Sequence, residues 1–212
     1  MAQVHFFTFN AFAENTYIIA DGTKECIIID PGCHTASEQR KLVQFIEDRK
    51  LQPVALVNTH CHIDHVFGNH FISDKYQLPL AAHEGEAPVL DAAVPYGKMM
   101  GLNVTPSPPI SVFLEGGQTL RFGETVLDIL FTPGHSPASL SFYCSSHKWV
   151  IAGDVLFRLG IGRTDLPGGN MNTLLQSIEK QLFTLPDDTT VWSGHGEKTT
   201  IGYEKRNNPF LR

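Results

Sequence analysis

The side chains best suited to chemistry begin in the segment "NTHCHIDHVFGNH", which covers positions 58–70. Five of its members are imidazoles or carboxylates: His60, His62, Asp64, His65 and His70. Imidazole nitrogens and carboxylate oxygens are usual ligands of zinc and other transition metals. The segment therefore predicts a metal site, without fixing how many ions it holds. His70 falls in the helix expected after the motif, with a register that turns it away from the ligand loop, so we expect it to be structural.

Three further candidates occur later in the chain, each after an apolar stretch that ends in glycine: His135, Asp154 and His195. In mixed α/β folds, ligand sites gather where strands end, and glycine permits the tight backbone that a crowded site needs. Together with four residues of the first segment, they provide seven nitrogen and oxygen donors. That is too many for one tetrahedral zinc and suits two metals that share a carboxylate.

The cysteines offer no competing metal site. The chain has four of them, none in a C-x-x-C pair, and scattered free thiols suit a reducing compartment. Cys61 lies between two candidate ligands, but histidines of the usual zinc type already flank it, so we interpret it as a spacer. A donor set of histidines and carboxylates favours an open catalytic site over a closed structural one.

Strands and one helix are expected to position the first segment. "ENTYIIAD" and "KECIIIDPG" are rich in Ile and bounded by turn residues, which predicts two strands. "TASEQRKLVQFIEDRK" begins with a capping residue and has helical apolar spacing, which predicts a helix over 35–50. "PVALVNTH" predicts a short buried strand whose end delivers the ligand segment into a loop.

The second half of the chain nearly repeats this order. "TLRFGETVLDILFTPGH" predicts a β-hairpin, "SLSFYCSSHKWVIAGDV" a second pair of strands, "MNTLLQSIEKQLFTL" an amphipathic helix and "TTVWSGHG" a last short strand. A terminal helix is expected over 199–212, after capping threonines. Two such halves predict two sheets packed together with helices outside.

Residues 84–115 interrupt this regular pattern. The stretch mixes Pro, Gly, paired Met and apolar residues. Long irregular segments in compact domains are usually functional, so a lid or binding loop is expected here, with a loosely packed connector as the alternative.

Composition limits the partners. The net charge of −6 disfavours nucleic acid, whose phosphates need clustered Lys and Arg. No apolar run approaches the roughly 20 residues that span a bilayer, and the aromatic N-terminus lacks the features of a signal peptide. We therefore expect a cytoplasmic protein with no membrane partner.

The motifs "THCHIDH", "TPGHS", "AGD" and "SGHG" resemble, in this order, the metallo-β-lactamase superfamily, and "IDPG" matches its first motif through Asp30. The resemblance spans nearly the whole chain and implies one domain over 1–212, a four-layer αββα sandwich of α/β class with the metals at one edge. It also implies a ligand assignment. One zinc would take His60, His62 and His135, and the other Asp64, His65 and His195. Asp154 would bridge them, and Asp30 would hold the ligand loop in place.

Within that superfamily, "AGDVLFRLGIGRTDLPGGN" and "GHGEKTTIGYEKRNNPFL" are similar to the glyoxalase II (hydroxyacylglutathione hydrolase) branch, in its short single-domain bacterial type. This implies hydrolysis of S-D-lactoylglutathione or a related small-molecule thioester. Two metals about 3.5–4 Å apart can hold a hydroxide between them as nucleophile. Asp64 would lie next to it as the catalytic acceptor of its proton.

The resemblance has one departure. Full-length glyoxalase II enzymes carry a C-terminal helical domain that holds glutathione, and this chain stops soon after its last ligand motif, so no such domain is expected. Four basic residues are candidates to replace it, although each also has a structural interpretation: Arg158, Arg163, Lys205 and Arg206.

Alternatives stay open on the sequence alone. A persulfide dioxygenase with one iron, held by His60, His135 and Asp154, has a related fold, and another hydrolase of the superfamily could cut a lactone or ester. A secreted β-lactamase is disfavoured by the missing signal peptide. Iron or manganese could replace zinc, and the chain could be a monomer or a homodimer.

Overall fold

The computed structural model of the chain describes residues 2–211 and divides them into two compact units. The first unit holds the residues up to 113 together with 121–125, and the second holds 114–120 and the residues from 126 onward. The ends of the domain predicted over 1–212, Met1 and Arg212, lie outside the described residues. Each unit contains a six-stranded sheet with its own helices, as the sequence predicts for a mixed α/β fold.

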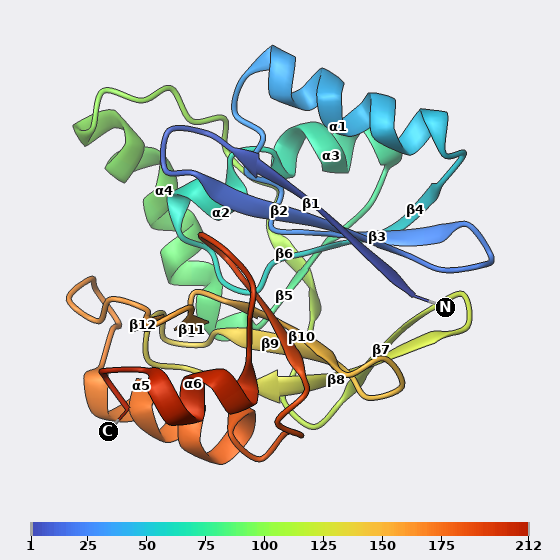
Figure 1. The fold of residues 1–212 in the computed structure, drawn as a ribbon. Helices are drawn as coiled ribbons and strands as arrows, with labels where there is room; N and C mark the ends of the chain where they lie inside the picture. Colours follow the sequence, from blue (N-terminus) through green and yellow to red (C-terminus); the bar gives the residue numbers. More distant parts are fainter. Residues whose placement is uncertain (1, 212) are drawn as a thin grey trace. The chain divides into compact units, whose positions relative to one another are not determined.

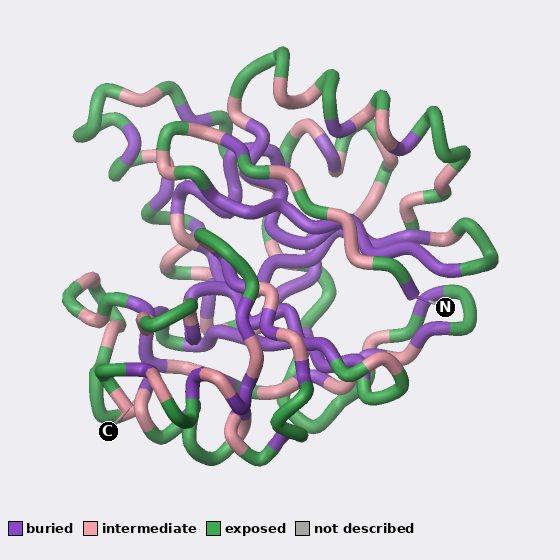
Figure 2. Tube along the Cα trace, viewed as in Figure 1, coloured by how far each residue is buried: buried purple, intermediate pink, exposed green. Residues whose placement is uncertain are grey.

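The sheet of the first unit runs in chain order from β1 to β6. Strands β1 to β3 are antiparallel, whereas β3 to β6 pair in parallel. The central strands β2 and β3 are almost entirely buried (Figures 1 and 2). The strands are β1 (Gln3–Phe9), β2 (Glu14–Ala20), β3 (Glu25–Ile29), β4 (Gln52–Val57), β5 (Leu80–Ala82) and β6 (Ile110–Phe113).

The helices of the first unit pack on this sheet through one apolar cluster. Leu42 and Ile46 of α1, Ile72 of α3 and Leu90 of α4 join the buried strand residues in it. The predicted helix after β3 is confirmed as α1, and Thr35 and Glu38 form its capping box. The helices are α1 (Ala36–Asp48), α2 (Ile63–Val66), α3 (Asn69–Tyr76) and α4 (Ala87–Met99).

The prediction that residues 84–115 are irregular is wrong for residues 84–99. A 3-10 turn, Glu84–Glu86, leads directly into the 13-residue helix α4. Pro88 lies in the first helical turn, where its missing N–H costs nothing. Gly97 packs against Val104 and Ile63, where a larger side chain would overlap them. Pro88 and Gly97, which suggested a break, thus start and pack this helix. Within 84–115, residues 100–109 and 114–115 lack helix or strand.

The second sheet has the order β14-β13-β10-β9-β8-β7. The pairs β14 with β13, β10 with β9 and β9 with β8 are antiparallel, whereas β10 and β13 run in parallel. The strands are β7 (Thr119–Phe122), β8 (Thr125–Phe131), β9 (Leu140–Cys144), β10 (Trp149–Gly153), β13 (Thr190–Ser193) and β14 (Thr199–Thr200). A separate short hairpin, β11 (Leu156–Phe157) with β12 (Gly160–Ile161), follows β10.

Helices α5 (Met171–Ser177) and α6 (Ile201–Asn207) cover this sheet, and α5 continues into a π-helical turn, Ile178–Leu182. Leu174, Ile178 and Ile201 form its core with strand residues. The helix predicted over 199–212 is shorter than expected. Thr200 caps it, and Asn208 precedes a proline, which disfavours helical backbone. Among residues 2–211, no helix has the length and apolar character needed to cross a bilayer.

Candidate metal centre

The predicted ligands fall into two groups, one in each compact unit. The first ligand cluster, in the first unit, consists of His60, His62, Asp64 and His65. The second ligand cluster, in the second unit, consists of His135, Asp154 and His195. Each cluster is built by strand ends and the loops that follow them.

Parallel strands β3 and β4 place the first ligand cluster. Asp30 follows β3 and Asn58 follows β4, so both leave the same edge of the sheet. The N–H of Asp30 donates to the carbonyl of Val57 over 2.9 Å, which ties the two strand ends together. Asp30 adopts a left-handed backbone with φ of 50°, a conformation that Asp tolerates better than most residues.

The Asp30 carboxylate is the main anchor of the ligand loop. Its Oδ1 accepts from the N–H of Thr59 over 2.7 Å and from the Asn58 amide over 3.2 Å. Its Oδ2 accepts from the Thr59 hydroxyl over 2.5 Å and lies 3.1 Å from His65 Nδ1. This geometry is what the predicted role of Asp30 requires, because one buried carboxylate holds both the backbone and a histidine ring.

These contacts determine which ring nitrogens can bind metal. Since the Thr59 hydroxyl donates to Asp30, it must accept from His60 Nδ1, 3.0 Å away. His65 likewise directs its Nδ1–H at Asp30. Both rings therefore carry the proton on Nδ1 and keep a lone pair on Nε2, which is the arrangement usual for metal-binding histidines.

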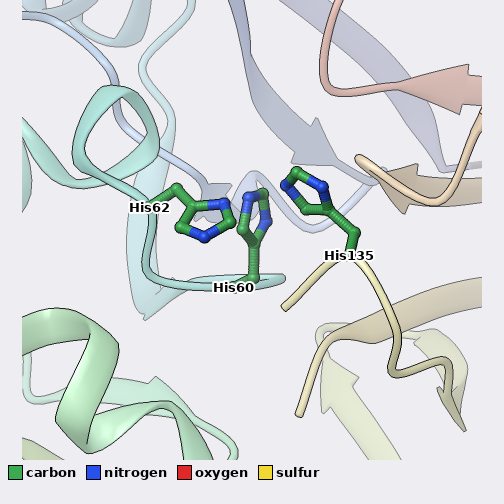
Figure 3. A group of neighbouring side chains, drawn as sticks. All are labelled: His60, His62 and His135. Atoms are coloured by element: carbon green, nitrogen blue, oxygen red, sulfur yellow. The ribbon is translucent and has the colours of Figure 1, made fainter. Parts of the chain in front are cut away.

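The ligand rings of the first ligand cluster lie close together. The His60 and His65 ring centroids are 4.2 Å apart, and those of His60 and His62 are 4.8 Å apart. Figure 3 shows His60 and His62 on the segment after β4, drawn with His135 of the second unit. Asp64 lies in the first turn of α2, and its Oδ2 is 3.7 Å from His65 Nε2. His60 and His65 are fully buried.

Sequence reasoning missed two buried carboxyl groups beside this cluster. Glu14 accepts from the Thr16 hydroxyl over 2.9 Å and lies 3.9 Å from His65 Nδ1. Burial raises the pKa of Glu14 well above its usual range, His65 opposes this, and Asp30 adds to it. Glu86 accepts from the N–H of Cys61 over 2.9 Å. An acidic residue within an apolar strand was the only sequence signal for Glu14, and Glu86 lay in the segment expected to be irregular.

Two observations bear on Cys61, which we interpret as a spacer between two candidate ligands. Its side chain is fully buried, and burial raises the pKa of the thiol well above its usual range, with Glu86 adding to the effect. His70, which we expected to be structural, lies exposed in the first turn of α3.

Parallel strands β10 and β13 place the second ligand cluster. Asp154 follows β10 and His195 follows β13, and Gly153 pairs with Ser193 where the strands end. His195 Nε2 lies 3.4 Å from Asp154 Oδ2, and His135 Nε2 lies 3.5 Å from the same oxygen. Two imidazole nitrogens thus converge on one carboxylate oxygen.

A backbone carbonyl orients His135. Its Nδ1 donates to the carbonyl oxygen of Arg163 over 2.8 Å, so the proton is on Nδ1 and the unprotonated nitrogen, Nε2, lies 3.5 Å from Asp154 Oδ2. Gly162 precedes that carbonyl. A Cβ there would overlap the Asp154 carbonyl oxygen and lie 3.0 Å from the His135 ring, so only glycine fits this position.

The four basic residues considered for substrate binding all have acidic partners. Arg158 contacts Glu197 over 2.5 Å, and Arg163 makes a two-pronged contact to Asp165 with both distances 2.7 Å. The Arg163 hydrogen bonds lower the pKa of Asp165 to about 2. Lys205 and Arg206 both approach Asp187, over 2.7 and 3.6 Å. Each side chain is thus anchored at the surface of the second unit, and a substrate contact stays a prediction.

The donor set fits transition-metal ions. Both clusters combine imidazole nitrogens with carboxylate oxygens, and His60, His65 and His135 have Nδ1 engaged by an oxygen. Zinc, iron and manganese all accept such ligands. In the first unit, His60, His65 and Asp30 each offer one ligand-type atom, and these three atoms lie within 4.8 Å of one another.

Comparison with known proteins gives one family. A family model described as the metallo-β-lactamase superfamily matches residues 10–195. The probable metallo-hydrolase YqgX of Bacillus subtilis is 43% identical, over 92% of this chain and 90% of that protein. The hydroxyacylglutathione hydrolase GloC of Haemophilus influenzae is 37% identical, over 95% of this chain and 94% of that protein.

Solved structures agree. The crystal structure of the BLEG-1 B3 metallo-β-lactamase matches with a TM-score of 0.90 and 34% identity, over 99% of each chain. TTHA1623 in a di-iron-bound form matches with a TM-score of 0.88 and 36% identity, over 98% of this chain and all of that one. These matches, together with the two sheets, confirm the fold class expected from the sequence.

Proposed function

We propose that this chain, which belongs to the metallo-β-lactamase superfamily, is a binuclear metal-dependent hydrolase that cleaves acyl thioesters. Membership of a family of metallo-hydrolases supports metal-dependent hydrolysis. The thioester substrate and zinc as the native metal are the further steps that the proposal adds.

The observation that carries the proposal is the orientation of the histidine rings. Three of them, His60, His65 and His135, have Nδ1 bound to an oxygen and Nε2 left as a ligand atom. A histidine that binds metal through Nε2 must carry its proton on Nδ1, and an oxygen usually accepts a hydrogen bond from that N–H. Buried histidines without a metal can adopt either tautomer. The pattern occurs in both ligand clusters, which supports a role for each in holding an ion.

We assign the ligands as the family resemblance implies. His60, His62 and His135 would hold one ion, Asp64, His65 and His195 the other, and Asp154 would lie between them. The convergence of two imidazoles on Asp154 Oδ2 supports its place as the shared carboxylate. The assignment requires the two ligand clusters to act as one centre.

The bound ions would supply Lewis acidity, which favours ionised water at neutral pH and polarises a carbonyl. The chain's own residues do the rest. Asp64 is placed to take up a proton at its carboxylate, since it lies beside His65 in the first ligand cluster. Asp30 keeps His65 in the tautomer that binds metal, and the Arg163 carbonyl does the same for His135.

A thioester is the substrate class that suits these residues. A thiolate leaves without needing a proton, so the site requires no dedicated general acid. The name of the relative GloC, a hydroxyacylglutathione hydrolase, supports the same class. We propose S-D-lactoylglutathione as the first substrate to test, with Arg158, Arg163, Lys205 and Arg206 as candidates to bind its carboxylates.

A second candidate is hydrolysis of a β-lactam amide. The observation that favours it is the TM-score of 0.90 to a structure described as a B3 metallo-β-lactamase. A chromogenic cephalosporin distinguishes the two, because a thioesterase leaves its ring intact.

The test compares metal-loaded protein with S-D-lactoylglutathione and with the cephalosporin, before and after removal of metal by a chelator. We expect thioester cleavage that the chelator abolishes and that Zn²⁺ restores. Asp154→Ala should abolish it, and Asp64→Asn should reduce it. Thioester cleavage that survives in Asp154→Ala would contradict the mechanism, and cleavage of the cephalosporin alone would favour the second candidate.

A further inference from the structure

Glu86 is a fully buried carboxyl group at the end of the 3-10 turn that precedes α4. Burying a carboxylate is costly unless polar groups receive it. It occupies the N-cap position of α4 but makes no capping hydrogen bond with its side chain. Its Oε2 instead accepts from the N–H of Cys61, 25 residues earlier, over 2.9 Å. Glu86 therefore uses its side chain to bind the ligand loop and not to cap its own helix.

The position of Cys61 gives this contact its meaning. Cys61 is the residue between His60 and His62, in a stretch without strand pairing. Two residues earlier, the N–H of Thr59 donates to the Asp30 carboxylate over 2.7 Å. Alternate backbone amides of this segment are thus held by two buried carboxylates, one on each side of His60.

The two anchors have different effects on the ligands. Asp30 orients rings directly, since it contacts His65 and reaches His60 through the Thr59 hydroxyl. Glu86 accepts a hydrogen bond from the backbone N–H of Cys61, between His60 and His62. It therefore fixes the position of the backbone from which both histidine side chains extend.

We propose that Glu86 is a positioning residue for the metal centre, which fixes the backbone between His60 and His62. The inference rests on the proposed function in so far as these histidines bind metal. It predicts that Glu86 controls metal affinity without touching the substrate.

The experiment uses the full chain with Zn²⁺ as the probe. Glu86→Gln keeps the shape and an acceptor oxygen but cannot ionise, and Glu86→Ala removes the acceptor altogether. Asp21→Asn is the matched control, because Asp21 is another buried carboxylate of the same unit that is hydrogen-bonded by Thr23, Glu124 and Thr125 rather than by the ligand loop. Zn²⁺ dissociation constants come from competition with a chromogenic chelator, and NMR follows the exchange of the Cys61 amide in metal-free protein.

Loss of a partner that orients metal ligands typically weakens affinity about 10- to 100-fold. We expect about 10-fold for Glu86→Gln and about 100-fold for Glu86→Ala, with faster Cys61 amide exchange in Glu86→Ala and wild-type affinity in Asp21→Asn. Wild-type affinity in both Glu86 variants would overturn the inference, as would an equal loss in Asp21→Asn, which would reveal general destabilisation.

The outcome separates this inference from the proposed function. Zinc binding that depends on Glu86, in a protein that cleaves no thioester, supports the inference and contradicts the substrate. Thioester cleavage together with zinc binding that ignores Glu86 supports the function and overturns the inference. A wild-type chain that binds no Zn²⁺ overturns both.

Discussion

The two ligand clusters are held in place by different means. In the first ligand cluster, two buried carboxyl groups hold the ligand loop. Asp30 accepts hydrogen bonds from the Asn58 amide, the Thr59 N–H and hydroxyl, and His65 Nδ1. Glu86 accepts one from the Cys61 N–H. In the second ligand cluster, backbone groups hold the ligands in place. The carbonyl of Arg163 orients His135. The N–H of Gly194 donates to the carbonyl of Gly153 over 2.8 Å, which joins the segments that carry His195 and Asp154.

The difference implies two kinds of sensitivity. The first ligand cluster should respond to the loss of a charge at unchanged shape, whereas the second should respond to a change in backbone path at unchanged charge. Single substitutions can separate these effects because each cluster offers a residue that alters one property alone.

The largest effect is expected from Asp30→Asn. Asn tolerates the left-handed backbone at this position, so the change removes the charge and one acceptor while keeping the shape. Hydrogen bonds to a charged group contribute about 1.5–3 kcal/mol, and Zn²⁺ affinity should fall about 10- to 100-fold. Urea unfolding of metal-free protein measures the loss of stability, and competition with a chelator measures the loss of Zn²⁺ affinity. Unchanged affinity would show that carboxylate charge is not what holds the first ligand cluster.

The next effect tests the backbone of the second ligand cluster. In Gly162→Ala, the new Cβ overlaps the Asp154 carbonyl and approaches the His135 ring, so the chain must shift, at a cost of about 1–3 kcal/mol. Gly160→Ala is the control, because its Cβ would meet Phe157 at an ordinary distance of 3.5 Å. Thermal unfolding and Zn²⁺ affinity should both decline for Gly162→Ala alone. Equal behaviour of the two variants would mean that close packing at Gly162 does not matter.

Asp21 tests whether a buried carboxylate stabilises the fold away from any ligand. Burial raises its pKa, but hydrogen bonds from Thr23, Glu124 and Thr125 outweigh this and lower the pKa to about 2. A carboxyl group whose pKa is depressed on folding stabilises the protein above its unfolded pKa, near 4, and that stability is lost as the pH falls toward 2. The shift corresponds to about 2 kcal/mol.

Urea unfolding of metal-free wild type and Asp21→Asn at pH 5.5 and pH 3 measures this contribution. The stability difference between the two proteins should shrink at the lower pH. A difference that stays constant between the two pH values would show that Asp21 does not titrate as its hydrogen bonds imply.

The smallest effect is expected at the surface of the second unit. Arg158→Gln breaks the exposed contact to Glu197, and exposed ion pairs contribute at most about 1 kcal/mol. Thermal unfolding should therefore change little, while the KM for S-D-lactoylglutathione reports on the predicted substrate role. A KM that rises while kcat and stability hold would assign Arg158 to the substrate, and an unchanged KM would leave it as a surface residue.

Much of the fold was predictable from local signals. The capping box of α1 and the Ile-rich runs of β2 and β3 were each visible in a short window. The ligand motifs were visible because their spacing places them directly after strands. The helix α4 was not, because Pro95 and Gly97 in its interior disfavour a helix locally, and only packing against Ile63 and Val104 shows why Gly97 is tolerated there.

The supporting residues of the site could not be identified in the same way. Glu86 and Cys61 are 25 residues apart, and the Arg163 carbonyl and His135 are 28 apart. No local pattern marks an acidic residue as buried, since its burial depends on donors supplied by distant segments. The sequence therefore predicted the candidate ligands and, through the family resemblance, Asp30, while Glu86 and the Arg163 carbonyl emerged from the three-dimensional contacts.

The central claim is that the two ligand clusters together hold two metal ions. Elemental analysis of the purified chain after Zn²⁺ loading and gel filtration tests it most directly, with Asp154→Ala measured beside the wild type. We predict two equivalents of zinc per chain in the wild type and fewer in the variant. One equivalent or none in the wild type, or two equivalents retained by Asp154→Ala, would contradict it.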